Sequence, residues 1–94
     1  RTFMGISKDR KTVYAVCVDG RWNGSEGSAG VTLDDEGRIL KVLGAWDGIN
    51  LDGGGSSTMW SKSEGVVSYP CRNKKFDHAG DRRVSSCIVV KSKK

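Results

Sequence analysis

Short apolar and β-branched segments, separated by polar turns, occupy the first part of the chain and predict β-strands. The first strand is predicted over Thr2–Ser7, and residues 8–11 predict a polar hairpin turn. Residues 12–18 are rich in β-branched and aromatic side chains and predict a second strand, which closes at Asp19-Gly20. Residues 22–30 are rich in Gly and Ser without periodicity, so a loop is expected there.

A helical spacing of apolar residues follows this loop and predicts a helix over Leu33–Leu43. Thr32 can cap its N-terminus, and the acidic residues of the first turn suit the positive end of the helix dipole. Gly37 weakens the helix by about 1 kcal/mol of propensity, and Gly44 is expected to end it. The helix is expected to pack on a sheet, because four apolar residues fall near one face. These residues are Leu33, Ile39, Leu40 and Leu43.

The second half of the chain is again strand-like. A turn is expected at residues 62–65, between two strands. Pro70 is expected to end the second of these strands, and residues 71–82 predict a long polar loop. The order of strands, one helix and further strands predicts an α+β fold with a mixed sheet, in one domain over residues 1–94. The four later strands are predicted at residues 46–51, 57–61, 66–69 and 83 or 84–90.

Length and composition limit the core that this chain can build. It has 94 residues, of which 36% are hydrophobic and 13 are glycine, so little apolar surface is available for burial. The sequence has no apolar run near the ~20 residues of a membrane span and no signal peptide. Because it begins at Arg1 without an initiator methionine, we expect a processed or excised segment.

The net charge of +5, from 16 basic and 11 acidic residues, favours anionic partners such as phosphate esters or acidic glycans. The alternative is a solvated surface with a basic C-terminal end. Nucleic-acid binding would require aromatic side chains interleaved with the basic ones on one face. The three tryptophans are instead scattered, so no nucleic-acid partner is expected.

Three cysteines fit no metal-binding spacing. Cys17 and Cys87 lie in strand-like segments and are expected to be buried free thiols that pack as small hydrophobes. One disulfide with a leftover thiol, in a secreted parent, is the alternative. Cys71 lies in the predicted polar loop.

The densest polar chemistry lies between residues 50 and 58. A short apolar strand ends in Asp52, and three glycines and three hydroxyl residues follow it. Consecutive glycines cost conformational entropy, so they indicate a backbone that takes positive φ or approaches a ligand closely. Their exposed amides can form a nest for an anionic oxygen. The residues that follow Asp52 are Gly53, Gly54, Gly55, Ser56, Ser57 and Thr58.

This glycine run differs from the known phosphate loops. A nucleotide P-loop would place a lysine after the glycines, and none follows here. A dinucleotide-binding motif would open a helix, whereas the residues after Gly55 predict a strand. A ligand-facing turn remains the favoured interpretation.

Two carboxylates share a position at strand ends. Asp19 ends the second predicted strand and Asp52 ends the one after the helix. If these strands are neighbours, both carboxylates emerge at one edge of the sheet. Such a pair supports acid–base or nucleophilic chemistry at a sugar carbon, or holds a divalent cation, although no spacing requires a metal and no cofactor is expected. The alternative is that each caps a turn by accepting backbone amides.

Arginines and one histidine complete the candidates. Arg21 follows Asp19-Gly20, and Arg82 and Arg83 precede the last predicted strand. A guanidinium suits bidentate contact with phosphate, although either of the paired arginines is equally a solvated charge. His78 lies in the polar loop, where a surface role is the simpler reading, although its titration range suits a general acid.

Several motifs together carry a resemblance to the phosphodiester glycosidase family, which includes the lysosomal uncovering enzyme and bacterial proteins linked to exopolysaccharides. The block from Asn50 to Met59 is the most specific, and the similarity covers nearly the whole chain. The other matching motifs, in order, are Arg1-Thr2 with Gly5-Ile6, Val18-Asp19-Gly20-Arg21, Ser68-Tyr69-Pro70 and Arg83-Val84-Ser85.

The resemblance implies hydrolysis of a sugar-1-phosphodiester, such as an N-acetylglucosamine-1-phosphodiester, to free sugar and a phosphomonoester. It implies Asp52 as the first catalytic carboxylate and Asp19 as the second. It also implies that the chain is the C-terminal half of a catalytic domain whose upstream half is needed, in a secreted, cell-envelope or secretory-pathway protein. The substrate-binding residues it implies are Arg1, Arg21, Asn50, Gly53, Gly54, Gly55, Ser56, Ser57, Arg83 and Ser85. A non-catalytic module that binds phosphorylated glycans or sugar-phosphate polymers is the alternative.

Overall fold

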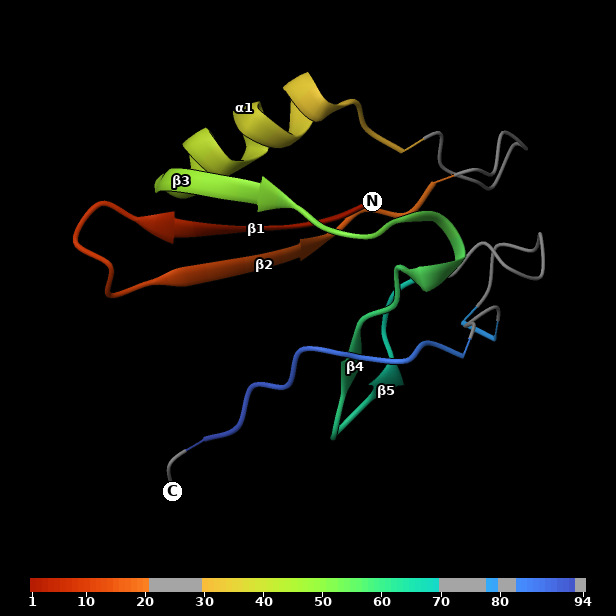
Figure 1. The fold of residues 1–94 in the computed structure, drawn as a ribbon. Coiled ribbons are helices and arrows are strands. Elements are labelled where there is room, and N and C mark those ends of the chain that lie inside the picture. Colours follow the sequence, from red (N-terminus) through yellow and green to blue (C-terminus); the bar gives the residue numbers. More distant parts are fainter. Residues whose placement is uncertain (21–29, 70–77, 80–82, 93–94) are drawn as a thin grey trace.

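The computed structural model describes residues 1–20, 30–69, 78–79 and 83–92. These residues form an α+β arrangement of one helix and two antiparallel sheets (Figure 1), which confirms the predicted α+β class. The sheet was expected to be mixed, but every strand pair among the described residues is antiparallel. In chain order the elements are β1 (Thr2–Ser7), β2 (Val13–Cys17), α1 (Leu33–Leu43), β3 (Ala45–Asn50), the 3₁₀ helix η1 (Gly54–Ser56), β4 (Trp60–Ser61) and β5 (Gly65–Val66).

The larger sheet has the order β2-β1-β3, with β1 antiparallel to both neighbours. Gly5 in the centre of β1 is opposite Tyr14 on one side and Gly48 on the other. A polar turn joins β1 to β2, as predicted, and its Asp9 accepts hydrogen bonds from Ser7 Oγ at 2.6 Å and from the Lys11 amide at 3.0 Å. Both bonds stabilise the ionised carboxylate and hold the pKa of Asp9 below its usual value.

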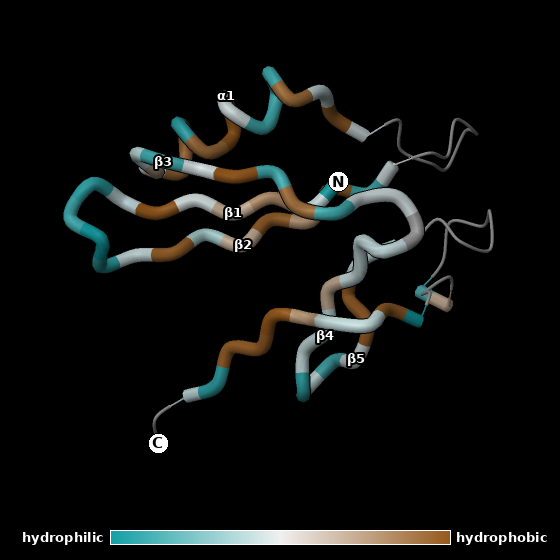
Figure 2. The backbone as a smooth tube through the Cα atoms, in the orientation of Figure 1, coloured by the Kyte–Doolittle hydropathy of each residue, from teal (hydrophilic) through white to brown (hydrophobic). Residues whose placement is uncertain are grey.

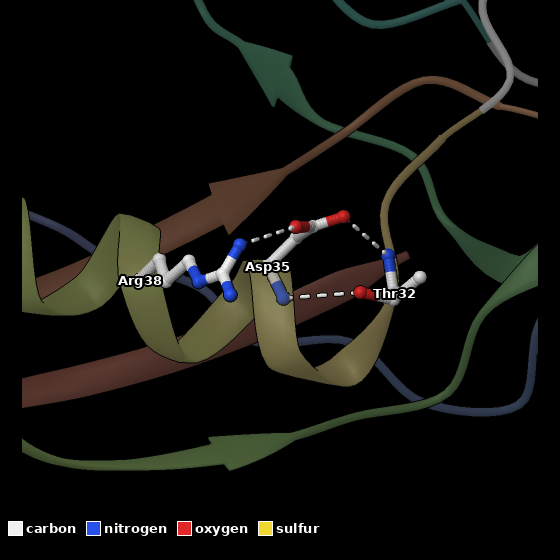
Figure 3. A network of polar contacts seen from close by, with 3 residues as sticks. All are labelled: Thr32, Asp35 and Arg38. Atoms are coloured by element: carbon white, nitrogen blue, oxygen red, sulfur yellow. Dashed lines mark hydrogen bonds and ion pairs between the residues drawn. The ribbon is translucent and has the colours of Figure 1, made fainter.

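Helix α1 begins and ends as the sequence predicts. Thr32 Oγ1 accepts from the Asp35 amide, and Asp35 Oδ2 accepts from the Thr32 amide, both at 3.1 Å (Figure 3). This reciprocal capping box satisfies two amides that a helix N-terminus leaves unpaired, and it lowers the pKa of Asp35. At the other end Gly44 adopts φ 103° and donates to the carbonyls of Leu40 and Lys41, a conformation that glycine takes without strain.

The helix covers one face of the larger sheet through Leu40 (Figure 1). Among the described residues, Phe3 and Leu40 are the buried apolar side chains, at 0% and 8% exposure. Two of the four predicted core residues of the helix lie outside this contact, because Leu33 is 58% and Leu43 is 44% exposed. The core is therefore small and centres on where Leu40 meets the sheet.

Two glycines of the sheet make room for Leu40. A Cβ on Gly5 would lie 2.8 Å from Leu40 Cδ2 and 2.9 Å from Ala45 Cβ. A Cβ on Gly48 would overlap Leu40 Cδ1 and lie 3.0 Å from the backbone oxygen of Met4. The paired glycines thus let the helix approach the sheet closely.

We expect Gly48→Ala to lower the free energy of unfolding by about 1–3 kcal/mol, because the added methyl group overpacks this contact. Gly37→Ala is the matched control: nothing lies within 4 Å of a Cβ there, so helix propensity should raise stability by about 0.5–1 kcal/mol. Urea unfolding of both variants measures the difference. Equal stability of the two variants would contradict the close packing.

The later strands are shorter than predicted. The strands expected at residues 57–61 and 66–69 are only two residues long in the structure. They are β4 (Trp60–Ser61) and β5 (Gly65–Val66), which pair as a hairpin. The last predicted strand is wrong: residues 83–92 contain no strand, and Ile88, Val89 and Val90 are 63–88% exposed. Figure 2 shows this hydrophobic stretch near the C-terminus, apart from the larger sheet. A β-prone segment becomes a strand only when a neighbour satisfies its backbone groups.

In the part of the chain that the structure describes, no helix is long and apolar enough to cross a membrane.

Candidate functional site

A cavity of about 510 Å³ opens at the end of the larger sheet where β2 and β3 finish and β1 begins. Its described lining includes seven of the residues predicted for the site: Arg1, Asp19, Asn50, Asp52, Gly53, Gly54 and Ser57. The described lining also includes seven residues that were not predicted: Cys17, Val18, Gly20, Gly30, Val31, Leu51 and Tyr69. One end of the sheet thus gathers carboxylates, a guanidinium, an amide and glycine backbone.

The two carboxylates reach the cavity from two strands of the same direction. Their strands are not neighbours, which was the condition for a common edge, because β1 lies between β2 and β3. Since both outer strands are antiparallel to β1, they run parallel to each other and end at the same edge. Asp19 and Asp52 therefore line one cavity, as the common-edge prediction requires.

Asp19 is half-buried and is held by a distant part of the chain. Its Oδ1 accepts a hydrogen bond from the Tyr69 amide at 2.7 Å. This bond joins the end of β2 to the segment after β5, and it brings Tyr69 into the lining of the cavity. The bond fixes the orientation of the carboxylate.

Asp52 is exposed and begins the glycine-rich turn. Its Oδ1 accepts from the amide of Gly53 at 2.9 Å. The chain then forms η1, a short helix that was not predicted, with the amides of Ser56 and Ser57 donating to the carbonyls of Gly53 and Gly54. Gly54 takes φ 59°, which explains one glycine of the run. Each carboxylate accepts a backbone amide, as the turn-capping alternative predicts, and each also lines the cavity.

Hydroxyl groups tie the glycine turn to the sheet. Thr2 Oγ1 donates to Ser57 Oγ at 2.8 Å, and Ser57 is 7% exposed. The backbone of Leu51 donates to the carbonyl of Thr2 at 2.8 Å. The start of β1 therefore fixes the base of the turn on both sides of Asp52.

Arg1 brings positive charge to the cavity. Its Nε donates to the carbonyl of Val31 at 2.8 Å, and its backbone nitrogen donates to the carbonyl of Val18 at 3.0 Å. These bonds hold the guanidinium at the cavity, where its terminal nitrogens supply further donors in a fixed fork. The cavity can thus offer an anion a charged, directional contact.

Five other predicted residues are placed differently. Arg83 and Ser85 are exposed and are not among the described residues that line the cavity. Gly55 and Ser56 lie in η1, next to lining residues, and Arg21 falls outside the described residues. Among the described residues, no three His, Cys, Asp or Glu side chains are grouped so that they could hold a metal ion.

The cysteines differ from each other in surroundings. Cys17 is half-buried in β2 and lines the cavity, with its Sγ 4.0 Å from Thr2 Oγ1. Burial raises the pKa of its thiol. Cys87 is exposed and outside any strand, which corrects the expectation of a buried thiol there; both are free. Cys71 lies outside the described residues.

We expect iodoacetamide to alkylate Cys17 roughly tenfold more slowly than Cys87 at pH 7.5. The thiolate is the reactive form, and burial both shields Cys17 from the reagent and raises the pKa of its thiol. The rate at Cys17 should continue to rise with pH above about 8.5, the usual thiol pKa. Mass spectrometry of timed samples, with a Cys17→Ser variant to assign peaks, measures both rates. Equal rates would contradict the burial of Cys17.

Strand and charge patterns did not identify Tyr69 as a residue of this region, whereas His78 was already a candidate general acid from its titration range. Tyr69 falls in a segment that was predicted as a strand, and only its place in the Ser68-Tyr69-Pro70 motif pointed to it. His78 stacks on Tyr69, with ring centroids 4.2 Å apart at an interplanar angle of 30°. The structure therefore connects the polar loop to the wall of the cavity.

Comparison with known proteins gives one result. The family model of phosphodiester glycosidases matches residues 1–91. No curated protein and no solved structure shows a significant match. Because the family model spans essentially the whole sequence, this chain belongs to the phosphodiester glycosidase family.

Proposed function

We propose that this chain forms part of the active site of a hydrolase that cleaves a sugar-1-phosphodiester into free sugar and a phosphomonoester. The observation that carries the proposal is the cavity in which Asp19, Asp52 and Arg1 meet the glycine-rich turn. Family membership supports the glycosidase class. The sugar favoured by the sequence resemblance is N-acetylglucosamine.

The reaction needs one group that acts at the anomeric carbon and further groups that stabilise the departing phosphate. Asp52, at the exposed start of the turn, is proposed to act at the anomeric carbon, with Asp19 as the second carboxylate. Overall, water adds its oxygen to the anomeric carbon, and the carbon–oxygen bond to phosphate breaks with its electron pair on the phosphate. A proton of the water passes to a carboxylate or to the departing phosphate.

The remaining lining residues are proposed to bind the substrate. The guanidinium of Arg1 offsets the charge of the phosphodiester and the additional charge on the departing monoester. The glycines of the turn let the backbone approach the substrate, and Asn50 and Ser57 add polar groups at the same edge. Arg21, Arg83 and Ser85 remain proposals for substrate binding that stand on the sequence resemblance.

A binding module for phosphorylated glycans is the second candidate. It is favoured by the bonds that both carboxylates make to backbone amides, Asp19 to Tyr69 and Asp52 to Gly53, because such bonds are typical of structural carboxylates. The two candidates differ in turnover. A binder retains the diester unchanged, whereas the hydrolase consumes it.

Phosphorus NMR of an N-acetylglucosamine-1-phosphodiester, incubated with the intact protein, tests the choice. The hydrolase should replace the diester signal by that of a phosphomonoester, with equimolar free sugar. A broadened diester signal without any monoester would favour the binding module.

A further inference from the structure

His78 makes two contacts with the segment that holds Asp19. Its Nδ1 lies 2.6 Å from the carbonyl oxygen of Ser68, and its ring stacks on Tyr69. A carbonyl oxygen can only accept, so Nδ1 carries the proton and donates. One imidazole therefore fixes both residues of the Ser68–Tyr69 dipeptide, through the backbone of the first and the ring of the second.

The same dipeptide is anchored on its other sides. Ser68 is 6% exposed, and its Oγ accepts from the amide of Met59 at 3.0 Å. The amide of Tyr69 donates to Asp19 Oδ1 at 2.7 Å. The peptide group between Ser68 and Tyr69 carries both the carbonyl that His78 binds and the amide that Asp19 binds. Because a peptide group is planar and rigid, fixing its carbonyl also fixes the direction of its N–H.

We propose that His78 is a positioning residue that orients the Asp19 carboxylate in the cavity through the Ser68–Tyr69 peptide group. The consequence for catalysis rests on the proposed function, but the mechanical link between His78 and Asp19 does not. The link assigns a role to a histidine that the cavity lining does not include. Because Nδ1 donates to the Ser68 carbonyl, any proton transfer by His78 would have to use Nε2.

Three substitutions in the intact protein separate the two contacts. His78→Asn keeps a donor near the Nδ1 position but removes the ring; His78→Phe keeps the ring but removes the donor; His78→Ala removes both. Lys62→Ala, at an exposed position between β4 and β5, is the control. Thermal unfolding identifies any variant that fails to fold.

The first readout does not depend on activity: hydrogen exchange of the Tyr69 amide, followed by NMR. We expect His78→Ala to accelerate this exchange about fivefold or more, the effect of losing one net hydrogen bond, with His78→Asn closer to wild type. Lys62→Ala should leave it unchanged. Unchanged exchange at Tyr69 in folded His78→Ala or His78→Phe overturns the proposal, whether or not the protein hydrolyses any substrate.

The second readout is hydrolysis of the sugar-1-phosphodiester. His78→Ala should lower kcat by about 10- to 100-fold with little change in KM, because a misplaced catalytic group is costly. His78→Asn should recover most of the activity, with the wild-type pH profile. Loss of one limb of that profile in both His78→Asn and His78→Phe would overturn positioning in favour of proton transfer. If wild type shows no hydrolysis, the proposed function fails, and the exchange measurement still decides the role of His78.

Discussion

Asp52→Asn is expected to lower the kcat for sugar-1-phosphodiester hydrolysis in the intact protein by about 10²–10⁴-fold, the usual contribution of a general acid or base. Asparagine keeps the size of the side chain and an oxygen that can accept from the Gly53 amide, a bond of 2.9 Å in the structure. The turn should therefore fold as before, while the negative charge of the Asp52 side chain is lost from the cavity. Steady-state kinetics measures the effect, and circular dichroism checks the fold.

Asp47→Asn is the control for this substitution. Asp47 is exposed on β3, the strand that precedes Asp52, and is not among the described residues that line the cavity. Its replacement should leave kcat within about twofold of wild type, as expected for a surface substitution. If Asp52→Asn retains nearly normal kcat, then Asp52 is a turn-capping residue, and its catalytic role is lost from the account.

Phe3→Ala is expected to lower the free energy of unfolding by about 3–5 kcal/mol. Phe3 is fully buried in β1, the central strand, and the described core offers little else to compensate. Because small domains are stable by only about 5–15 kcal/mol, this loss should remove much of the total stability. Urea unfolding monitored by tryptophan fluorescence measures the change.

Val13→Ala is the matched control in the same sheet. Val13 is 60% exposed on β2, so its truncation should cost less than about 1 kcal/mol. Similar losses for Phe3→Ala and Val13→Ala would contradict a core that centres on β1. The comparison matters for function, since β1 also carries Thr2, which is bonded to the glycine turn at Ser57.

Local signals in the sequence predicted the parts of the fold that depend on neighbouring residues. Helix α1 has the predicted bounds because its caps, Thr32 with Asp35 and the left-handed Gly44, act within a few residues. The first strand, Thr2–Ser7, also has the predicted bounds. The strand ends that carry Asp19 and Asp52 could be predicted locally, whereas their meeting in one cavity depends on the strand order β2-β1-β3.

Features that depend on distant partners could not be predicted in the same way. The position of β1 between β2 and β3 depends on pairing across more than forty residues, as in Met4 opposite Ile49. The exposed segment at Ile88 and Val89 has strand-like composition but no strand pairing. Tyr69 reaches the cavity through a bond to Asp19, fifty residues away, and no local pattern encodes such a contact.

Hydrolysis in ¹⁸O-enriched water tests the central claim, that this family member attacks the anomeric carbon and not phosphorus. After a single turnover, the products of an N-acetylglucosamine-1-phosphodiester are separated, and mass spectrometry measures the ¹⁸O content of each. We predict the label in the anomeric hydroxyl of the free sugar and none in the phosphomonoester. Label in the phosphomonoester would show cleavage of the phosphorus–oxygen bond and would contradict the account.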